Sequence, residues 1–267
     1  ARLLVDDELW SIVAPLLPQR TPTAFGGRPA SSDRAALAGI VFVLRTGIPW
    51  EDVPHELGCS GVTCWRRLRD WQRAGVWDQI LAVLLARLHR VGGLDWSRAA
   101  VDSAQAPAKG GRRDGADPTD RGKLGSKHHV ITDRDGTPLA SPWLTPSNVP
   151  DVVTLITMVD RIRPIRGRRG RPRRRPTKVH CDLGYVSRAN RRALRQRHIC
   201  PRIARKGIES RERLGRHRWV AERTLAWLHR FRRLLIRYER DPEIHQALLT
   251  VAAVLICWSK IKRLGRF

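Results

Sequence analysis

The chain has 267 residues, is 42% hydrophobic and carries a formal net charge of +26. This size and apolar content exclude a disordered chain and suit one large domain or two ordinary ones. No apolar run reaches the roughly 18 to 20 residues that span a bilayer. The five cysteines are odd in number and form no CxxC pair, so we expect neither a disulfide framework nor a zinc site.

The first part of the chain has a helical pattern. Helices are predicted over 3–17, 33–45 and 77–88, and a Pro/Gly/Ser/Thr linker over 18–32. A short helix in "WEDVPHELG" and a longer one in "SGVTCWRRLRDWQRAG" are separated by Gly58, which is the layout of a helix-turn-helix DNA reader, although other helical hairpins share it. In the longer helix the residues expected to face inward are Val62, Trp65, Leu68 and Trp71. We predict a helical DNA-binding domain over 1–96, with DNA contacts from Arg66, Arg67 and Arg69.

From residue 97 strands alternate with helices. Strands are predicted in "RAAVDSAQA", in the hairpin "SKHHVITDRDGTPLASPWL", in "TKVHCDLGY" and in "HICPRIA". Helices are predicted in "VPDVVTLITMVDRI", "SRANRRALRQR" and "RWVAERTLAWLHRF", and over 244–261. This order indicates an α/β domain over 97–267, a mixed sheet with helices on its faces.

The positive charge lies almost wholly in this second part. Residues 1–96 hold 11 Lys and Arg against 10 Asp and Glu, whereas residues 97–267 hold 40 against 15. Codon preference in a GC-rich genome explains the excess of Arg over Lys, but not the one-sided excess over acids. We therefore predict a polyanionic partner, most commonly nucleic acid.

Two basic loops are the candidate phosphate-binding segments. They are 107–125, and 161–175 with nine arginines in fifteen residues. Either could be a solvated charge run, but their positions between strands and helices favour contact with DNA. The residues predicted to contact DNA here are Lys123, Lys127, Arg166, Arg168 and Arg169.

Three acids of the basic part occupy unusual positions. Asp102 lies within an apolar strand, Asp182 ends a strand just before Gly184, and Glu222 lies on a helix among arginines. Such carboxylates can meet at the end of a sheet and hold two Mg²⁺ ions. Each also has an ordinary alternative: backbone hydrogen bonds for Asp102, a helix cap for Asp182, and an ion pair with Arg218 for Glu222.

Over nearly its whole length the sequence resembles the DDE transposases of bacterial insertion sequences, in the group named after the fifth numbered element. The resemblance is carried by "GRPASSDRAALAGIVFVLRTGIPWEDVP", "VDSAQAPAKGG", "PTDRGKLGSKHHVITDRDGTPL", "HCDLGY" and "RWVAERTLAWLHRFRRLLIRYER". It implies a ribonuclease-H-like core in which Asp102, Asp182 and Glu222 are catalytic metal ligands. In the related Y-R-E-K signature, Arg218 matches the Arg, whereas Gly215 and His229 stand where that signature has Tyr and Lys. Arg218, His229 and Arg230 are therefore further candidates for DNA contact.

The resemblance implies a DNA transposase that uses two Mg²⁺ ions, with Mn²⁺ as a substitute. It would bind the terminal inverted repeats of an insertion sequence, cleave double-stranded DNA and join the 3′-OH ends to target DNA. A homodimer or higher oligomer on DNA, no membrane partner, and a bacterial cytoplasmic, nucleoid-associated location are the matching expectations. The alternatives are a catalytically idle DNA-binding regulator derived from a transposase and a nuclease without strand transfer.

Overall fold

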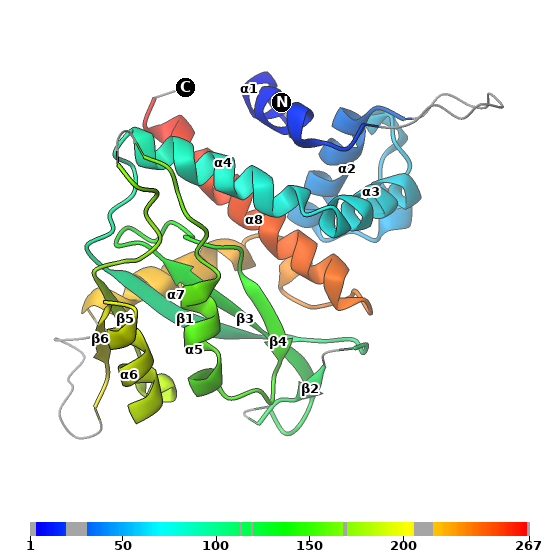
Figure 1. Ribbon diagram of the computed structural model, residues 1–267. Helices are drawn as coiled ribbons and strands as arrows, with labels where there is room; N and C mark the ends of the chain where they lie inside the picture. Colours follow the sequence, from blue (N-terminus) through cyan, green and yellow to red (C-terminus); the bar gives the residue numbers. More distant parts are fainter. Residues whose placement is uncertain are drawn as a thin grey trace.

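A mixed β-sheet lies at the centre of the computed structural model, which describes residues 4–19, 31–112, 114–118, 120–167, 170–205 and 216–265 (Figure 1). The strands are β1 (Ala99–Pro107), β2 (Gly115–Ala116), β3 (Leu124–Thr132), β4 (Trp143–Pro146), β5 (Lys178–Cys181) and β6 (Cys200–Ile203). Their order is β2-β3-β1-β5-β6, and β4 pairs with β3. β1 is antiparallel to β3 and parallel to β5, and β5 is parallel to β6. The predicted α/β fold class, a mixed sheet flanked by helices, is confirmed; its ribonuclease-H-like character stays an implication of the resemblance.

Helices cover both faces of this sheet. They are α5 (Leu155–Asp160), α6 (Arg188–Gln196), α7 (Arg216–His229) and α8 (Pro242–Arg263). α5 and α6 lie in front of the sheet in Figure 1, and α7 lies behind it. From Gly125 onward every residue of β3 is buried, as expected for a strand that is covered on both faces.

The N-terminal part is helical, as predicted. Its elements are α1 (Asp7–Val13), η1 (Ala14–Leu16), α2 (Asp33–Thr46), η2 (Trp50–Asp52), η3 (His55–Leu57), α3 (Gly61–Arg73) and α4 (Val76–Arg90). α8 packs along α4 and also touches α3, so one hydrophobic cluster runs through both parts of the chain (Figure 1). The division into domains at residues 96 and 97 stays a prediction.

α8 corrects the expectation that no apolar run is long enough for a membrane span. It has 22 residues, and among the described residues it is the one helix with the length and composition to cross a membrane. However, 78% of its apolar window is buried inside the protein. Its apolar surface is therefore already covered by this fold, as in the core helix of a globular protein.

The helix-turn-helix prediction needs correction before α3. The segment predicted as a short helix forms two separate 3-10 turns, η2 and η3, with Pro54 between them. Proline has no backbone N–H, which disfavours a continuous helix there. Val62, predicted to face inward, is 57% exposed, and Cys64 takes the buried position instead. The linker 18–32 lies largely outside the described residues.

Two segments of the second part also differ from their predictions. The predicted loop 107–125 contains the short strand β2, which pairs with β3, and the ends of β1 and β3. Arg237, from the far end of the chain, bonds Asp114 in this region. The predicted helix over 149–162 is divided into η4 (Asp151–Val153) and α5. None of the five cysteines, all of which the structure describes, forms a disulfide.

Candidate functional site

Asp102 and Asp182 occupy matching positions on neighbouring parallel strands. The pairing of β1 with β5 places Ala100 opposite His180. Two residues beyond this pair come Asp102 in β1 and Asp182 directly after β5. Adjacent strands lie about 4.8 Å apart. The buried hydroxyl of Tyr185 senses both carboxylates, since Asp102 and Asp182 are among the groups that raise its pKa. The structure thus brings the two predicted aspartates together at the carboxyl end of the sheet.

Glu222 lies on the helix that crosses the same face of the sheet. Near the start of α7 the ring of His217 lies 5.2 Å from that of His180 on β5, and at its end the ring of His229 lies 5.6 Å from that of His128 on β3. His128 pairs with Ala104, which shares a face of β1 with Asp102. The two histidine contacts bracket Glu222 along α7, and its side chain is exposed.

The three acids share a face but do not form one coordination shell. Within the described ranges, no three His, Cys, Asp or Glu side chains are grouped in a way that could hold a metal ion. Asp102 Oδ1 accepts a hydrogen bond from the backbone N–H of Ser103 at 2.9 Å. Asp182 caps η5 (Leu183–Tyr185) by accepting from the N–H of Gly184 at 2.9 Å, while Ser187 caps α6. The ordinary alternatives for both aspartates are therefore present, and the metal-ligand role of the three acids stays a prediction.

A fourth acid, Asp151, lies beside this pair and is not among the site residues predicted from the sequence. Its Oδ1 accepts from Ser103 Oγ at 3.0 Å and from Lys127 Nζ at 3.2 Å. A Cβ added to Gly184 would lie 3.1 Å from Asp182 Oδ1 and 3.6 Å from Asp151 Oδ2, so these two carboxylates approach the same point. In the sequence, Asp151 stands near the start of a predicted helix. That position suits a helix-capping residue as well as a site residue, so it does not identify Asp151 as part of the site.

Tyr185 closes the floor of the site. Its side chain is 1% exposed, and its hydroxyl has no hydrogen-bond partner in the described part of the chain. Burial is the largest cause that raises the pKa of Tyr185 well above its ordinary value, and the charges of Asp151, Asp102 and Asp182 add to it. Tyr185 is therefore a neutral packing residue.

The charges at the site suit a divalent cation. Asp102, Asp182 and Asp151 all lie near enough to the Tyr185 hydroxyl to raise its pKa, and Asp151 also pairs with the ammonium group of Lys127. Burial lowers the pKa of His129 to about 4, so it adds no charge at neutral pH. Carboxylate oxygens are the donors that Mg²⁺ prefers, and an excess of negative charge favours its binding. Asp102 and Asp182 therefore offer the kind of donor atom that the implied metal takes, but the described residues do not form a complete coordination shell.

The predicted DNA-contact residues of α3 are differently placed. Arg66 is exposed. Arg67 Nε lies 3.1 Å from Asp33 on α2, and its side chain is only 22% exposed. Arg69 pairs with Asp70 at 2.8 Å, and its guanidinium stacks on Trp65. Of the three, Arg66 is the side chain that α3 offers to a partner, and contact with DNA stays a prediction for all of them.

Lys127 and His229 are not presented outward. Lys127 is 8% exposed, and its ammonium donates to the carbonyl of Val149 at 2.9 Å as well as to Asp151. His229 Nε2 lies 3.4 Å from His128 Nδ1, and burial lowers the pKa of its imidazole. These internal contacts occupy both side chains, and the contact of Lys127 and His229 with DNA stays a prediction.

The remaining candidates divide into exposed and undescribed residues. Lys123 is exposed and pairs with Asp120 at 3.2 Å, and Arg230 is exposed at the end of α7. Arg166 is also exposed. Residues Arg168, Arg169 and Gly215, and the side chain of Arg218, lie outside the part that the structure describes.

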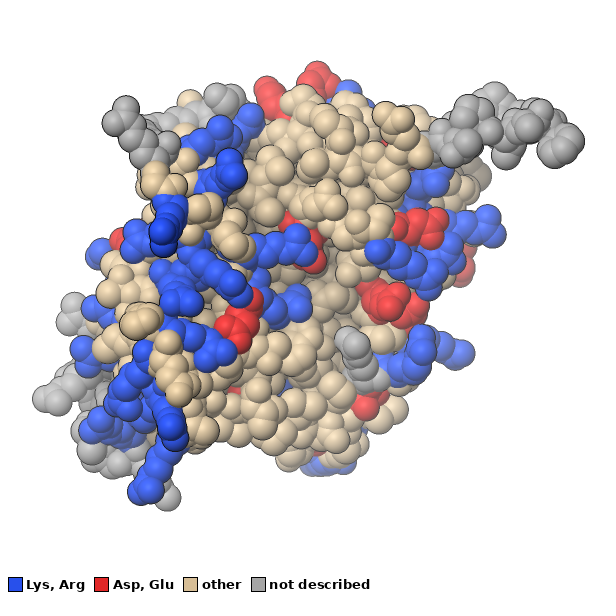
Figure 2. All heavy atoms as spheres, in the orientation of Figure 1, with Lys and Arg blue, Asp and Glu red and all other residues tan. Residues whose placement is uncertain are grey.

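Basic side chains gather along one side of the molecule. Figure 2 shows them on the left, where α6 and β6 lie in Figure 1. On α6 the exposed arginines are Arg188, Arg192 and Arg195. Sequence reasoning assigned this helix no role in DNA contact, although three exposed arginines on one helix are a usable signal.

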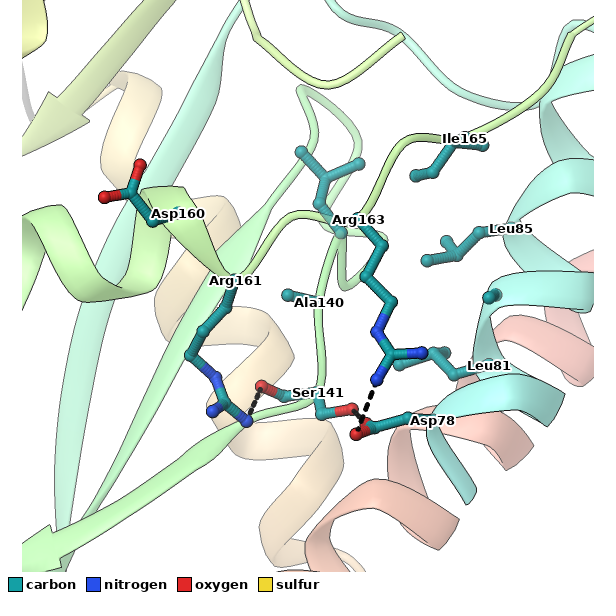
Figure 3. Close-up of a pocket in the computed structure, with 11 residues that line it drawn as sticks. Asp78, Leu81, Leu85, Ala140, Ser141, Asp160, Arg161, Arg163 and Ile165 are labelled. Carbon is teal, nitrogen blue, oxygen red and sulfur yellow. Dashed lines mark hydrogen bonds and ion pairs between the residues drawn. The ribbon is translucent and has the colours of Figure 1, made fainter. Parts of the chain in front are cut away.

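The arginine-rich segment begins with two arginines that serve the fold. Figure 3 shows a pocket of about 250 Å³ between α4 and this segment, in which Arg163 reaches Asp78 at 3.3 Å and Arg161 donates to the carbonyl of Ser141. Burial lowers the pKa of Arg161. Asp160 points away from the pocket and pairs with Arg197 at 2.7 Å. The pocket contains none of the three predicted catalytic acids, so it is not the candidate active site.

Two family models match this chain. Residues 87–257 match the transposase DDE domain, and residues 5–81 match the putative transposase of the IS4/5 family. Because the first match alone covers more than half of the chain, the protein belongs to the transposase DDE family. The second match places it in the IS4/5 group, and it is a transposase of insertion-sequence type.

Two proteins of one insertion sequence element are similar in sequence to this chain. The chain is 54% identical over 149 residues to a putative transposase for insertion sequence element IS402 of Burkholderia cepacia, covering 56% of this chain and 70% of that protein. It is 56% identical over 113 residues to an uncharacterized 16.2 kDa protein of the same element and organism, covering 41% of this chain and 77% of that protein. Among solved structures, the Mos1 strand transfer complex matches 92% of this chain and 82% of that chain at 12% identity, with a TM-score of 0.31.

Proposed function

We propose that this transposase binds the terminal inverted repeats of an insertion sequence, cleaves DNA there and joins the 3′-OH ends to target DNA. The observation that carries the proposal is the matched position of Asp102 and Asp182 on neighbouring parallel strands, with Glu222 on the helix across the same face. Carboxyl ends of strands are where open α/β sheets form their sites.

Each acid has a separate part in this proposal. Asp102, central in the sheet, and Asp182, at the turn after β5, offer oxygens on a rigid base. Glu222 on α7 would complete the ligand set. Together they would hold Mg²⁺, which would activate the attacking oxygen and stabilise the leaving oxygen of a phosphodiester. No protein nucleophile is required, which suits the burial of the Tyr185 hydroxyl beside the pair.

DNA would lie over this end of the sheet and be held by phosphate contacts. The exposed arginines of α6 and Arg166 supply charge that is independent of sequence. Arg66 on α3 would contribute to reading the terminal repeats. A homodimer or larger assembly on double-stranded DNA, in the bacterial cytoplasm, completes the proposal.

The test replaces Asp102 by Asn or Glu222 by Gln and measures Mg²⁺-dependent nicking of a duplex that carries a terminal repeat. Both variants should lose cleavage to background while retaining DNA binding, because each change removes a ligand charge and keeps the side-chain shape. Asp95→Asn, which alters an acid paired with Arg134 away from the site, is the control and should cleave as the wild type does. Cleavage at the wild-type rate by either site variant would show that the acids are wrongly assigned.

The two rival functions need a different measurement. A nuclease without strand transfer would cut the terminal repeat but give no joined product from precut ends. A catalytically idle regulator would bind the repeat and give neither product. Of the three candidate functions, only a transposase gives joined product from precut ends.

A further inference from the structure

A groove runs between α7 and α8, on a part of the surface that the proposed chemistry does not use. Two adjoining cavities of about 380 and 500 Å³ form it. Both are lined by Trp227 of α7 and by Ile256 and Arg263 of α8, so they are continuous. One end reaches the turn after β3 at Asp135, and the other reaches Arg45 of α2.

The rim of this groove is basic. The cations that line it are Arg45, Arg223, Arg230, Lys260 and Arg263, against one carboxylate, that of Asp135. Lys260 is already balanced, because its ammonium lies 3.8 Å from both Asp133 and Asp135. In the described part of the chain, no carboxylate lies within ion-pairing distance of Arg223, Arg230 or Arg263. The groove therefore has uncompensated positive charge along most of its length, which suits an anionic ligand.

The floor of the groove is aromatic and apolar. It includes Trp227 and Phe231, which are both half-buried. The guanidinium of Arg223 stacks between two rings, 4.4 Å from the centre of Trp219 and 4.7 Å from that of Trp227. Cations at the rim with aromatic rings at the floor are the combination that binds a nucleic-acid strand, by its phosphates and by stacking on its bases.

The groove and Glu222 lie on different flanks of α7. Trp227 follows Glu222 by five residues, which is a rotation of about 140° around a helix. The flank with Arg223 and Thr224 is held against the turn after β3, where their side chains donate to the carbonyls of Asp135 and Gly136 at 2.6 Å. A strand in the groove is thus separated by the helix from the carboxylates.

We propose that this groove binds a DNA segment other than the one being cut, independently of its sequence. Its phosphates contact Arg230 and Arg263, and a base lies against Trp227. The inference rests on the proposed function for its ligand, because a transposase handles donor and target DNA together. Strand joining needs both segments on one protein, and α7 lies between the two sites.

The first test is the salt dependence of binding to an unrelated duplex, with Arg230 and Arg263 both changed to Gln. The slope of log affinity against log salt concentration should become shallower by about two, since each phosphate contact contributes about one. The control changes Arg73 and Arg134 to Gln, two exposed arginines outside the groove that pair with Glu243 and Asp95. This control removes the same charge and should leave the slope near that of the wild type.

The second test locates the DNA. The Asp102→Asn variant is irradiated with a duplex containing 5-iododeoxyuridine, and the crosslinked tryptic peptides are identified. The peptide 224–230, which contains Trp227, should carry the label. An unchanged slope in the groove variant, together with no label on this peptide, overturns the inference.

The remaining outcome is an interface between copies of the chain. If the groove variant loses oligomer mass by light scattering while its salt slope stays at the wild-type value, the groove is a protein interface and the inference is wrong. The proposed function is judged separately, by the cleavage assay with Asp102 and Glu222. DNA can occupy the groove even if those variants show that the acids are misassigned.

Discussion

Asp151 joins two strands and a turn at the edge of the candidate site. One carboxylate oxygen accepts from Ser103 of β1 and Lys127 of β3, and the other faces the turn at Gly184. Ser103 is the neighbour of Asp102, so this carboxylate fixes the strand next to the proposed metal ligand. Asp151 acts through Ser103 and Lys127, as a positioning residue.

The Asp151→Asn change should lower the free energy of unfolding by about 1–3 kcal/mol, because Lys127 would stay buried without its counter-charge. Changing Lys127 to Met in the same chain should recover part of the loss. A double-mutant cycle by urea unfolding measures this coupling. Strictly additive effects of the two changes would contradict a working ion pair.

His129 gives the protein a pH dependence on the acid side. Its pKa falls from 6.5 to about 4 because burial opposes its charged form. The pKa of His129 is lower in the folded state than in the unfolded state. Its contribution to the free energy of unfolding is therefore fully present above pH 6.5 and is lost as the pH falls toward 4. Between pH 7 and pH 5, urea unfolding should show a loss of about 2 kcal/mol from this group. In the His129→Gln variant, the free energy of unfolding should fall by about 2 kcal/mol less than in the wild type between pH 7 and pH 5. An equal fall in both proteins would refute the assignment to His129.

Among the elements, the basic loop after β1 depends on one distant arginine. The side chain of Arg237 is fully buried, and its guanidinium bonds the carboxylate of Asp114 and, at 2.9 Å, the hydroxyl of Ser126. Its backbone N–H donates to the carbonyl of Pro107 at 2.8 Å, and its own carbonyl accepts from Lys109 at 3.0 Å. The loop predicted from composition as a free basic segment is therefore held to the chain just before α8.

Replacing Arg237 by Met should reduce the free energy of unfolding by about 3–5 kcal/mol, because it leaves the Asp114 carboxylate buried and unpaired. Trypsin should then cut the chain at Arg112 sooner than in the wild type. Arg240→Met, at an exposed position three residues on, is the matched control. Equal stability and equal cutting of the two variants would show that the buried network contributes nothing.

For the whole molecule, the net charge of +26 sets the salt dependence expected of the proposed binding to DNA. Arg166 and the undescribed Arg168 and Arg169 follow two arginines that are used by the fold, so they are the first of their segment expected to contact phosphate. Contacts of this kind give affinity and register without reading sequence.

Changing Arg166, Arg168 and Arg169 to Ala should weaken binding to terminal-repeat and unrelated DNA alike. The salt slope should become shallower by about three, measured by fluorescence anisotropy. Arg34, Arg73 and Arg134, each paired with a carboxylate, form a control set of equal charge. A loss confined to the terminal repeat would instead assign these arginines to sequence recognition.

The sequence alone determined most of the order of strands and helices, β2 and the turns η2 and η3 excepted, since hydrophobic periodicity and turn residues are local properties of the chain. It also singled out Asp102 and Asp182, because a carboxylate within or directly after an apolar strand needs a reason. It failed where a side chain's role depends on distant partners. Lys127 reads as a surface cation, yet Val149 and Asp151 bury it.

Only the tertiary structure decided which acids meet. The parallel pairing of β1 with β5 joins residues about 80 positions apart, and no local pattern encodes that register. The same holds for α7, whose position over β1 and β3 is set by packing and by the contacts of His217 and His229 at its two ends. Candidate site residues can be found in the sequence because a carboxylate in an apolar strand is unfavourable without a partner. Their geometry, in contrast, comes from long-range burial and strand pairing.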